Sequence, residues 1–239
     1  MADVKESLKA LIPLIESKTH ESWHNKFKEK YKIEFNAVIN EELTPTNGGI
    51  SMGETMEMIN KHSKGDAIMV SDVGQHQMFA CRYAKFNSTK SNITSGGLGT
   101  MGFCLPAAIG AKMGRPDREV VAIIGDGGFQ MTIQELGTIF QTKVPVKIVV
   151  LNNEFLGMVR QWQELFFDSR YASTIMTNPN FVAIAEGYHI KSKKVTKRED
   201  LDGAVAEMLA SKESYFLEVM VEKENNVFPM IPTGASVSE

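Results

Sequence analysis

The sequence is poor in the features that mark membrane proteins and disulfide-rich secreted proteins. It has only two cysteines, Cys81 and Cys104, without metal-ligand spacing, and we expect both to be small buried hydrophobic residues in a reducing compartment. No apolar run approaches the roughly 18 residues that a membrane span needs. The N-terminus carries acidic residues and a short apolar patch broken by Pro13, so we expect no signal peptide and a cytoplasmic location.

The sequence also lacks a strong excess of either charge. The net charge of −3 gives no indication of nucleic-acid binding, so an anionic ligand would have to be held by local geometry. The most basic run, residues 191–198, is interpreted as a solvated strand edge followed by a helix start. Internal repeats and low-complexity segments are absent from the sequence. With 43% hydrophobic and 23% charged residues, the 239-residue chain is typical of one full-sized globular domain with some extra material.

The extra material is expected at the N-terminal end. Residues 3–31 show a narrow apolar stripe at helical spacing and are predicted to form a peripheral helix pair. The turn-rich residues 44–49 read as a linker. We therefore divide the chain into a helical segment with linker over residues 1–49 and a compact domain over residues 50–239.

Within the compact domain, predicted strands alternate with predicted helices. The strands are placed at residues 67–71, 190–195 and 215–221 and at the apolar runs before Gly125 and before Asn152. The helices are placed at residues 52–61, 77–83, 101–113, 156–166 and 198–211, with one between the two apolar runs and one starting at Pro179. This alternation predicts an α/β fold with a mostly parallel six-stranded sheet and helices on both faces.

The stretch from Glu119 to Arg160 carries the clearest chemical signal. One apolar strand runs into Gly125-Asp126-Gly127-Gly128, and after Gly127 another 24 residues lead to Asn152-Asn153 at the end of a second apolar strand. Parallel strands place such turns at one edge of the sheet. The carboxylate of Asp126 and the amide oxygen of Asn153 are hard ligands suited to Mg²⁺, and the bare glycines let backbone N–H groups approach a phosphate. The spacing predicts a clamp for a divalent metal and a diphosphate.

Three other stretches contribute candidate residues, although each has an ordinary structural interpretation when taken alone. Gln75 and His76 follow a predicted strand and could donate to phosphate oxygens or to a polar substrate, or could be ordinary polar residues of a surface loop. Met101 stands in a glycine-rich turn that lacks the Lys-Ser/Thr of a nucleotide P-loop, and could be a core residue. Met158 and Trp162 share a helical face that is either core or the wall of an apolar substrate pocket.

Taken together, these stretches resemble a known family. GDG followed at this distance by NN resembles the signature of enzymes that bind thiamine diphosphate, also called thiamine pyrophosphate. The flanking runs are similar to the catalytic subunit of acetolactate synthase (acetohydroxyacid synthase) over roughly residues 50–236. These runs are DVGQHQM, TSGGLGTMGFCLPAAIGA, NNEFLGMVRQWQELFFDSRY and the tail at residues 226–234.

The resemblance assigns roles to individual residues. The metal ligands would be the side chains of Asp126 and Asn153 and the backbone carbonyl of Phe155. Met101 would lie beneath the thiazolium and bend the cofactor, which makes a proton transfer within the cofactor possible. Met158 and Trp162 would line the pocket for a second 2-ketoacid. The full set implied for the cofactor is Gly74, Gln75, His76, Gly99, Met101, Gly125, Gly127, Gly128, Asn153, Gly157 and Met158.

The resemblance also implies a reaction and partners. Family enzymes decarboxylate pyruvate and join the remaining fragment to pyruvate or 2-oxobutyrate, with the thiazolium as electron sink. They are oligomers that can take a regulatory small subunit, and they carry FAD in a middle domain. The glutamate that protonates the aminopyrimidine belongs to a pyrimidine-binding domain, so no catalytic residue for that step is expected here and the chain alone should have little activity. The alternatives are a pyruvate oxidase or decarboxylase type of thiamine enzyme and a non-catalytic diphosphate-binding module.

Overall fold

The protein is described by a computed structural model that covers residues 2–231, 234 and 236. The predicted tail at residues 226–234 is therefore described except for Pro232 and Thr233, which lie outside the described residues. The chain divides into two compact units, Met1–Asn40 and Glu41–Glu239. Among the described residues, no helix is long and apolar enough to cross a membrane.

The first unit is helical and keeps most of its apolar side chains exposed. It contains α1 (Val4–Leu11), the 3-10 turn η1 (Ile12–Leu14), α2 (Glu21–Glu34) and the π-helical turn η2 (Phe35–Ile39). Asp3 caps α1, because its side chain accepts a 3.1 Å hydrogen bond from the N–H of Glu6. The large side chains with exposed surface here include Leu8, Leu11, Ile12, Ile15, Trp23, Phe27 and Tyr31.

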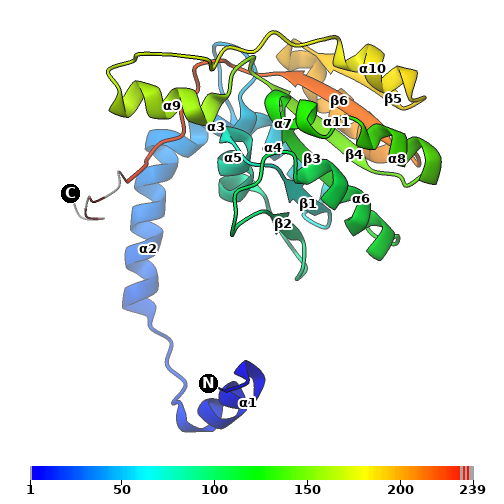
Figure 1. The fold of residues 1–239 in the computed structure, drawn as a ribbon. Coiled ribbons are helices and arrows are strands. Elements are labelled where there is room, and N and C mark those ends of the chain that lie inside the picture. The colour runs from blue at the N-terminus through cyan, green and yellow to red at the C-terminus, as the bar shows by residue number, and fades with distance from the viewer. Residues whose placement is uncertain (1, 232–233, 235, 237–239) are drawn as a thin grey trace. The chain divides into compact units, whose positions relative to one another are not determined.

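The second unit is built on a six-stranded sheet in which every pairing is parallel (Figure 1). The strand order is β2-β1-β3-β4-β6-β5. The strands are β1 (Ile68–Ser71), β2 (Asn92–Thr94), β3 (Val120–Gly125), β4 (Lys147–Asn152), β5 (Lys191–Val195) and β6 (Tyr215–Met220). The predicted fold class is confirmed, and the strand whose position was not predicted is the short edge strand β2.

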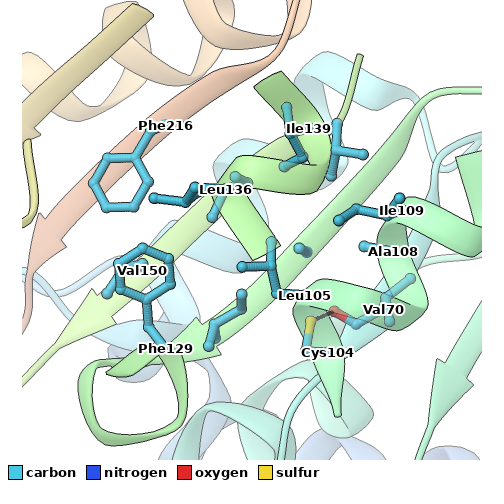
Figure 2. Packing of buried hydrophobic residues seen from close by; sticks show 14 of the residues in the cluster. Val70, Cys104, Leu105, Ala108, Ile109, Phe129, Leu136, Ile139, Val150 and Phe216 are labelled. Atoms are coloured by element: carbon cyan, nitrogen blue, oxygen red, sulfur yellow. Dashed lines mark hydrogen bonds between the residues drawn. The ribbon is translucent and has the colours of Figure 1, made fainter. Parts of the chain in front are cut away.

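Helices cover both faces of this sheet. The helices of this unit are α3 (Asn40–Leu43), α4 (Met52–Ser63), α5 (Gln75–Tyr83), α6 (Cys104–Gly114), α7 (Asp126–Met131), α8 (Glu135–Thr142), α9 (Gly157–Phe166), α10 (Phe181–Gly187) and α11 (Arg198–Ala210). One hydrophobic cluster joins alternate residues of β1, β3, β4 and β6 to α6, α7, α8 and α10, and Figure 2 shows Leu105, Leu136 and Phe216 within it. On the other face α4 packs against α5 and α11. Since both faces are covered, β3 is apolar throughout and β4 is apolar from Ile148 to Leu151.

Several predicted helix starts were wrong by a few residues, and one predicted helix is two. α5 begins at Gln75, so Gln75 and His76 lie on its first turn. α6 begins at Cys104 and leaves Met101 in the preceding turn. α7 and α8 replace the single helix expected after Gly125, because the chain leaves helical geometry at Thr132. Pro179 precedes α10, whose cap is the side chain of Asn180.

One of the two cysteines is buried as expected, and the basic run has the predicted secondary structure. Cys104 is fully buried, and its thiol lies 2.8 Å from the carbonyl oxygen of Val70. The expectation for Cys81 was wrong, because it lies on the exposed side of α5. Residues 191–198 form the edge strand β5 and the start of α11, as predicted. Four of their charged side chains form ion pairs: Lys191 and Lys193 with Glu207, Lys194 with Glu218 and Arg198 with Glu54.

Candidate functional site

The two turns predicted to form a clamp lie next to each other at the carboxyl ends of β3 and β4. Gly125 of β3 is paired with Leu151 of β4, which places the following residues, Asp126 and Asn153, on adjacent turns. Both side chains are almost completely buried, with 2% and 3% of their surface exposed. The backbone N–H groups of Gly127 and Glu154 both interact with the carboxylate of Asp126. The aspartate of the first turn is thus in direct contact with the second turn.

Burial controls the ionisation of Asp126. Loss of solvent raises its pKa to about 6, against an ordinary value of 3.8. A hydrogen bond from the Asn178 side chain and the backbone N–H groups of Gly127, Asp126 and Glu154 act in the opposite direction and lower this pKa. A buried carboxylate with this raised pKa is a group for which a bound cation would provide the missing charge compensation.

In the turn after β4, Asn152 and Asn153 make different contacts. Asn152 donates to the carboxylate of Glu218 at 2.8 Å and accepts from the N–H of Glu154 at 3.0 Å, so it fixes the turn itself. The chain then passes through Glu154 in the left-handed region, with φ 57°. The side-chain oxygen of Asn153 accepts from the N–H of Phe155 at 3.2 Å, and its NH₂ group extends toward the side-chain oxygen of Gln75 at 3.4 Å. Asn153 therefore presents an amide to the same space as Asp126.

Gln75 and His76 enter this space from the first turn of α5. The His76 ring lies against Gly74 and Gly125, where an added Cβ would come within 2.7 Å of the ring. Burial lowers the pKa of His76 to about 3, so the imidazole is neutral, and its Nε2 has no hydrogen-bond partner among the described residues. Gln75 receives a 3.4 Å contact from the Asn153 amide and donates to Gln161 at 3.0 Å. An unpaired buried nitrogen at this point is suited to a polar ligand.

Met101 is held in place by the residue that follows it. Gly102 has φ 83°, its N–H donates to Asp72 at 3.0 Å, and its carbonyl accepts from the Thr132 hydroxyl at 3.1 Å. These contacts bring the Met101 side chain toward Gly127, so that a Cβ at Gly127 would lie 3.6 Å from the Met101 methyl group. The thioether thus faces the glycine turn that contains Asp126.

These residues surround one cleft of about 400 Å³, part of it open to solvent. It is lined by Met52, Val73, Gly74, Gln75, His76, Met101, Gly125, Asp126, Gly127, Gly128, Leu151, Asn153, Phe155, Leu156, Gly157, Met158 and Val159. Two predicted site residues are not in this lining. Gly99 lies in the exposed part of its turn with nothing within 4 Å of an added Cβ, and Trp162 is 44% exposed beside Phe166 on α9.

The structure also adds residues that the sequence did not indicate. Asn178 lies in the loop after α9 and donates to Asp126 at 2.7 Å and to Asn152 at 3.0 Å. Gln161, only 1% exposed, joins Gln75 to the backbone of Val227 by a reciprocal pair of hydrogen bonds at 3.0 and 3.2 Å. Both act between segments far apart in sequence, so no local motif identifies them.

The donor set fits a magnesium diphosphate better than a bare metal ion. In the described part of the chain, no three His, Cys, Asp or Glu side chains gather in a way that could hold a metal. Asp126, Asn153 and the Phe155 carbonyl would supply three oxygens, and Mg²⁺ commonly completes its octahedron with phosphate oxygens and water. Glycines 127, 128 and 157 let the side chains of Leu156, Asp72 and Gln75 pack closely against this backbone, because an added Cβ would lie 2.7, 2.1 and 2.1 Å from them. The residues present fit the expected group.

Comparison with known proteins identifies a family and several relatives. The family model for the thiamine pyrophosphate enzyme C-terminal TPP-binding domain matches residues 72–219. Similar proteins include the acetolactate synthase isozyme 2 large subunit of Escherichia coli, 45% identical over 77% of this chain, and the acetolactate synthase large subunit of Lactococcus lactis, 40% identical over all of it. The chain spans 34% and 41% of those two proteins.

A solved structure is similar as well. It is the thiamine diphosphate-dependent 4-hydroxybenzoylformate decarboxylase of Rhodococcus jostii, with a TM-score of 0.70 and 27% identity. The match covers 76% of this chain and 34% of that one.

Proposed function

The chain belongs to the thiamine pyrophosphate enzyme family as its C-terminal TPP-binding domain, and on this premise we propose that it is the cofactor domain of an acetolactate synthase catalytic subunit. The observation that supports this most strongly is the meeting of the Asp126 and Asn153 turns in one buried cleft. The reaction proposed for the whole enzyme is decarboxylation of pyruvate and transfer of the remaining fragment to a second pyruvate or to 2-oxobutyrate.

When bound, thiamine diphosphate supplies the electron sink for the decarboxylation. The chain's own part is to bind and orient it. Asp126, Asn153 and the Phe155 carbonyl would hold Mg²⁺, which when bound would anchor the diphosphate rather than activate a carbonyl. The N–H groups beside the bare glycines and the neutral His76 would contact phosphate oxygens.

The apolar wall of the cleft has a separate proposed role. Met101 would support the thiazolium from below, and Met158, on the cleft wall, would limit the space for the second 2-ketoacid. Trp162 lies one turn farther along α9, and we propose that it borders the entrance to that space rather than the cofactor itself. FAD, the regulatory small subunit and oligomer formation are proposed for the whole enzyme by similarity and not for any residue named above.

A domain exchange tests the proposal. The corresponding segment of the Lactococcus lactis large subunit is replaced by this chain, and the products formed from pyruvate are identified, with an Asp126→Ala exchange as control. We expect acetolactate from the exchange protein and none from the control. Acetaldehyde or acetyl phosphate as the main product of a folded exchange protein would favour the pyruvate decarboxylase or oxidase type instead.

A further inference from the structure

The loop between α9 and α10 holds the backbone around Phe155. The N–H of Leu156 donates to the carbonyl of Thr174 at 2.8 Å, and the N–H of Met176 donates to the carbonyl of Glu154 at 2.8 Å. Phe155 and Ile175 thereby form an isolated antiparallel bridge. The residue whose carbonyl is a proposed metal ligand is thus fixed on both sides by a segment that comes about twenty residues later in the chain.

The same loop reaches the other turn through one side chain. The Nδ2 group of Asn178 donates to Oδ2 of Asp126 at 2.7 Å and to Oδ1 of Asn152 at 3.0 Å. The Oδ1 atom of Asn178 accepts a 2.9 Å hydrogen bond from Nε2 of Gln130 on α7. One amide therefore connects the turn after β3 to the turn after β4.

The chemistry of the neighbours sets the orientation of this amide. An ionised carboxylate only accepts hydrogen bonds, so the NH₂ group and not the oxygen of Asn178 must face Asp126. Gln130 supports that orientation by donating to the remaining oxygen. Because the donor is neutral, it fixes the carboxylate without competing with a cation for its charge, as an ammonium group would.

We propose that Asn178 is a positioning residue for the metal site, holding Asp126 in the geometry that Mg²⁺ requires while its loop fixes Phe155. The inference rests on the proposed cofactor site. Mg²⁺ demands near-ideal octahedral coordination, whereas Ca²⁺ accepts irregular and variable coordination. Loss of the positioning contact should therefore weaken Mg²⁺ binding more than Ca²⁺ binding, which a general loss of folding would not do.

The test uses the 239-residue chain and titration calorimetry with MgCl₂ or CaCl₂ in the presence of thiamine diphosphate. In Asn178→Leu, which keeps a similar volume but has no donor, the Mg²⁺ affinity should fall about 10- to 100-fold and the Ca²⁺ affinity clearly less. Asn178→Ala should behave in the same way. Asn180→Ala is the matched control, because the Asn180 side chain caps α10 by accepting from the N–H of Ala183 at 3.1 Å, and it should leave both affinities within about twofold. Unchanged Mg²⁺ affinity in Asn178→Leu, or equal losses for the two metals, overturns the proposal.

A second measurement separates this proposal from the proposed function. Without any ligand, amide hydrogen exchange at Glu154 should be faster in Asn178→Leu than in wild type, because the Glu154 N–H donates at 3.0 Å to the Asn152 oxygen that Asn178 also contacts. If wild-type chain binds neither metal nor cofactor, the proposed function fails, while the exchange rates still report on Asn178. Unchanged exchange at Glu154 would show that Asn178 does not hold the turns of Asp126 and Asn152 together.

Discussion

At the scale of single residues, Gly157 leaves room for two polar side chains that face the cleft. A Cβ at this position would come within 3.0 Å of both Gln75 and Asn153, a separation that real Cβ atoms do not show. Gly157→Ala should therefore displace these amides and lower the free energy of unfolding by about 1–3 kcal/mol. Urea denaturation measures the change.

Gly203 provides the matched control for that substitution. It lies inside α11, and nothing lies within 4 Å of an added Cβ. Gly203→Ala should stabilise the protein by about 0.5–1 kcal/mol, because alanine loses less backbone entropy in a helix. Equal effects of the two substitutions would show that Gly157 is not sterically constrained.

The raised pKa of Asp126 makes a prediction about pH. Its pKa is about 6 in the folded chain and 3.8 as an ordinary value, so the folded state retains the proton between these values. The contribution of this group to stability is present below about pH 4 and is lost as the pH rises to about 6. Between pH 4 and 7, the free energy of unfolding of Asp126→Asn should therefore gain up to about 3 kcal/mol relative to wild type.

Urea denaturation of wild type and Asp126→Asn at several pH values, without metal, measures this difference in the free energy of unfolding. His76 has the opposite dependence, since its lowered pKa of about 3 removes stability as the pH falls below its ordinary value of 6.5. Because His76 is present in both proteins, the difference between them isolates Asp126. A difference that does not change with pH would contradict the burial argument.

At the scale of elements, the glycine-rich turn between β2 and α6 contains two residues with positive φ in different surroundings. Gly99 has φ 63° and open space beside it, whereas Gly102 has φ 83° and would place a Cβ 3.1 Å from Met131 and Thr132. Gly99→Ala should cost about 1 kcal/mol of unfolding free energy from backbone strain alone. Gly102→Ala should cost about 2–3 kcal/mol, because steric contact adds to the strain.

Gly99→Ala and Gly102→Ala both change the turn that contains Met101. Thermal or urea denaturation gives the two costs, and the methyl resonance of Met101 reports whether its side chain has moved. We expect that resonance to shift in Gly102→Ala and to stay in Gly99→Ala. Similar costs and similar spectra for both would mean that the contacts of Gly102 with Asp72 and Thr132 do not fix the turn.

Elements with a strong local pattern were predictable, and weakly patterned ones were not. β3 and residues 148–151 of β4 are apolar runs that lead into Gly-Asp and Asn-Asn, so their positions and shared edge followed from the sequence. β2 has only three residues, none of them buried, and such a strand has no pattern to detect. The early start of α5 at Gln75 depends on the backbone of Gly74, which has φ 151°, and residue type alone does not reveal this.

At the scale of the whole molecule, the sequence identified the residues of the cleft better than the contacts that organise them. Asp126 and Asn153 could be assigned because each directly follows an apolar strand of a parallel sheet. Asn178 was missed because its partner Asp126 is 52 residues away and the loop that carries it has no periodic pattern. Helical spacing predicted that Trp162 shares a face of α9 with Met158. In the structure Met158 lines the cleft, whereas Trp162 is partly exposed and lies outside the lining.

The most direct test of the account is calorimetric titration of the chain with thiamine diphosphate and, separately, with ADP, each with and without Mg²⁺. We predict saturable binding of thiamine diphosphate that requires Mg²⁺ and is lost in Asp126→Ala, with no comparable binding of ADP. A general diphosphate-binding module would bind both ligands equally. Equal affinity for ADP, or binding of thiamine diphosphate that is unaffected by Asp126→Ala, would contradict the assignment of the cleft as a thiamine diphosphate site.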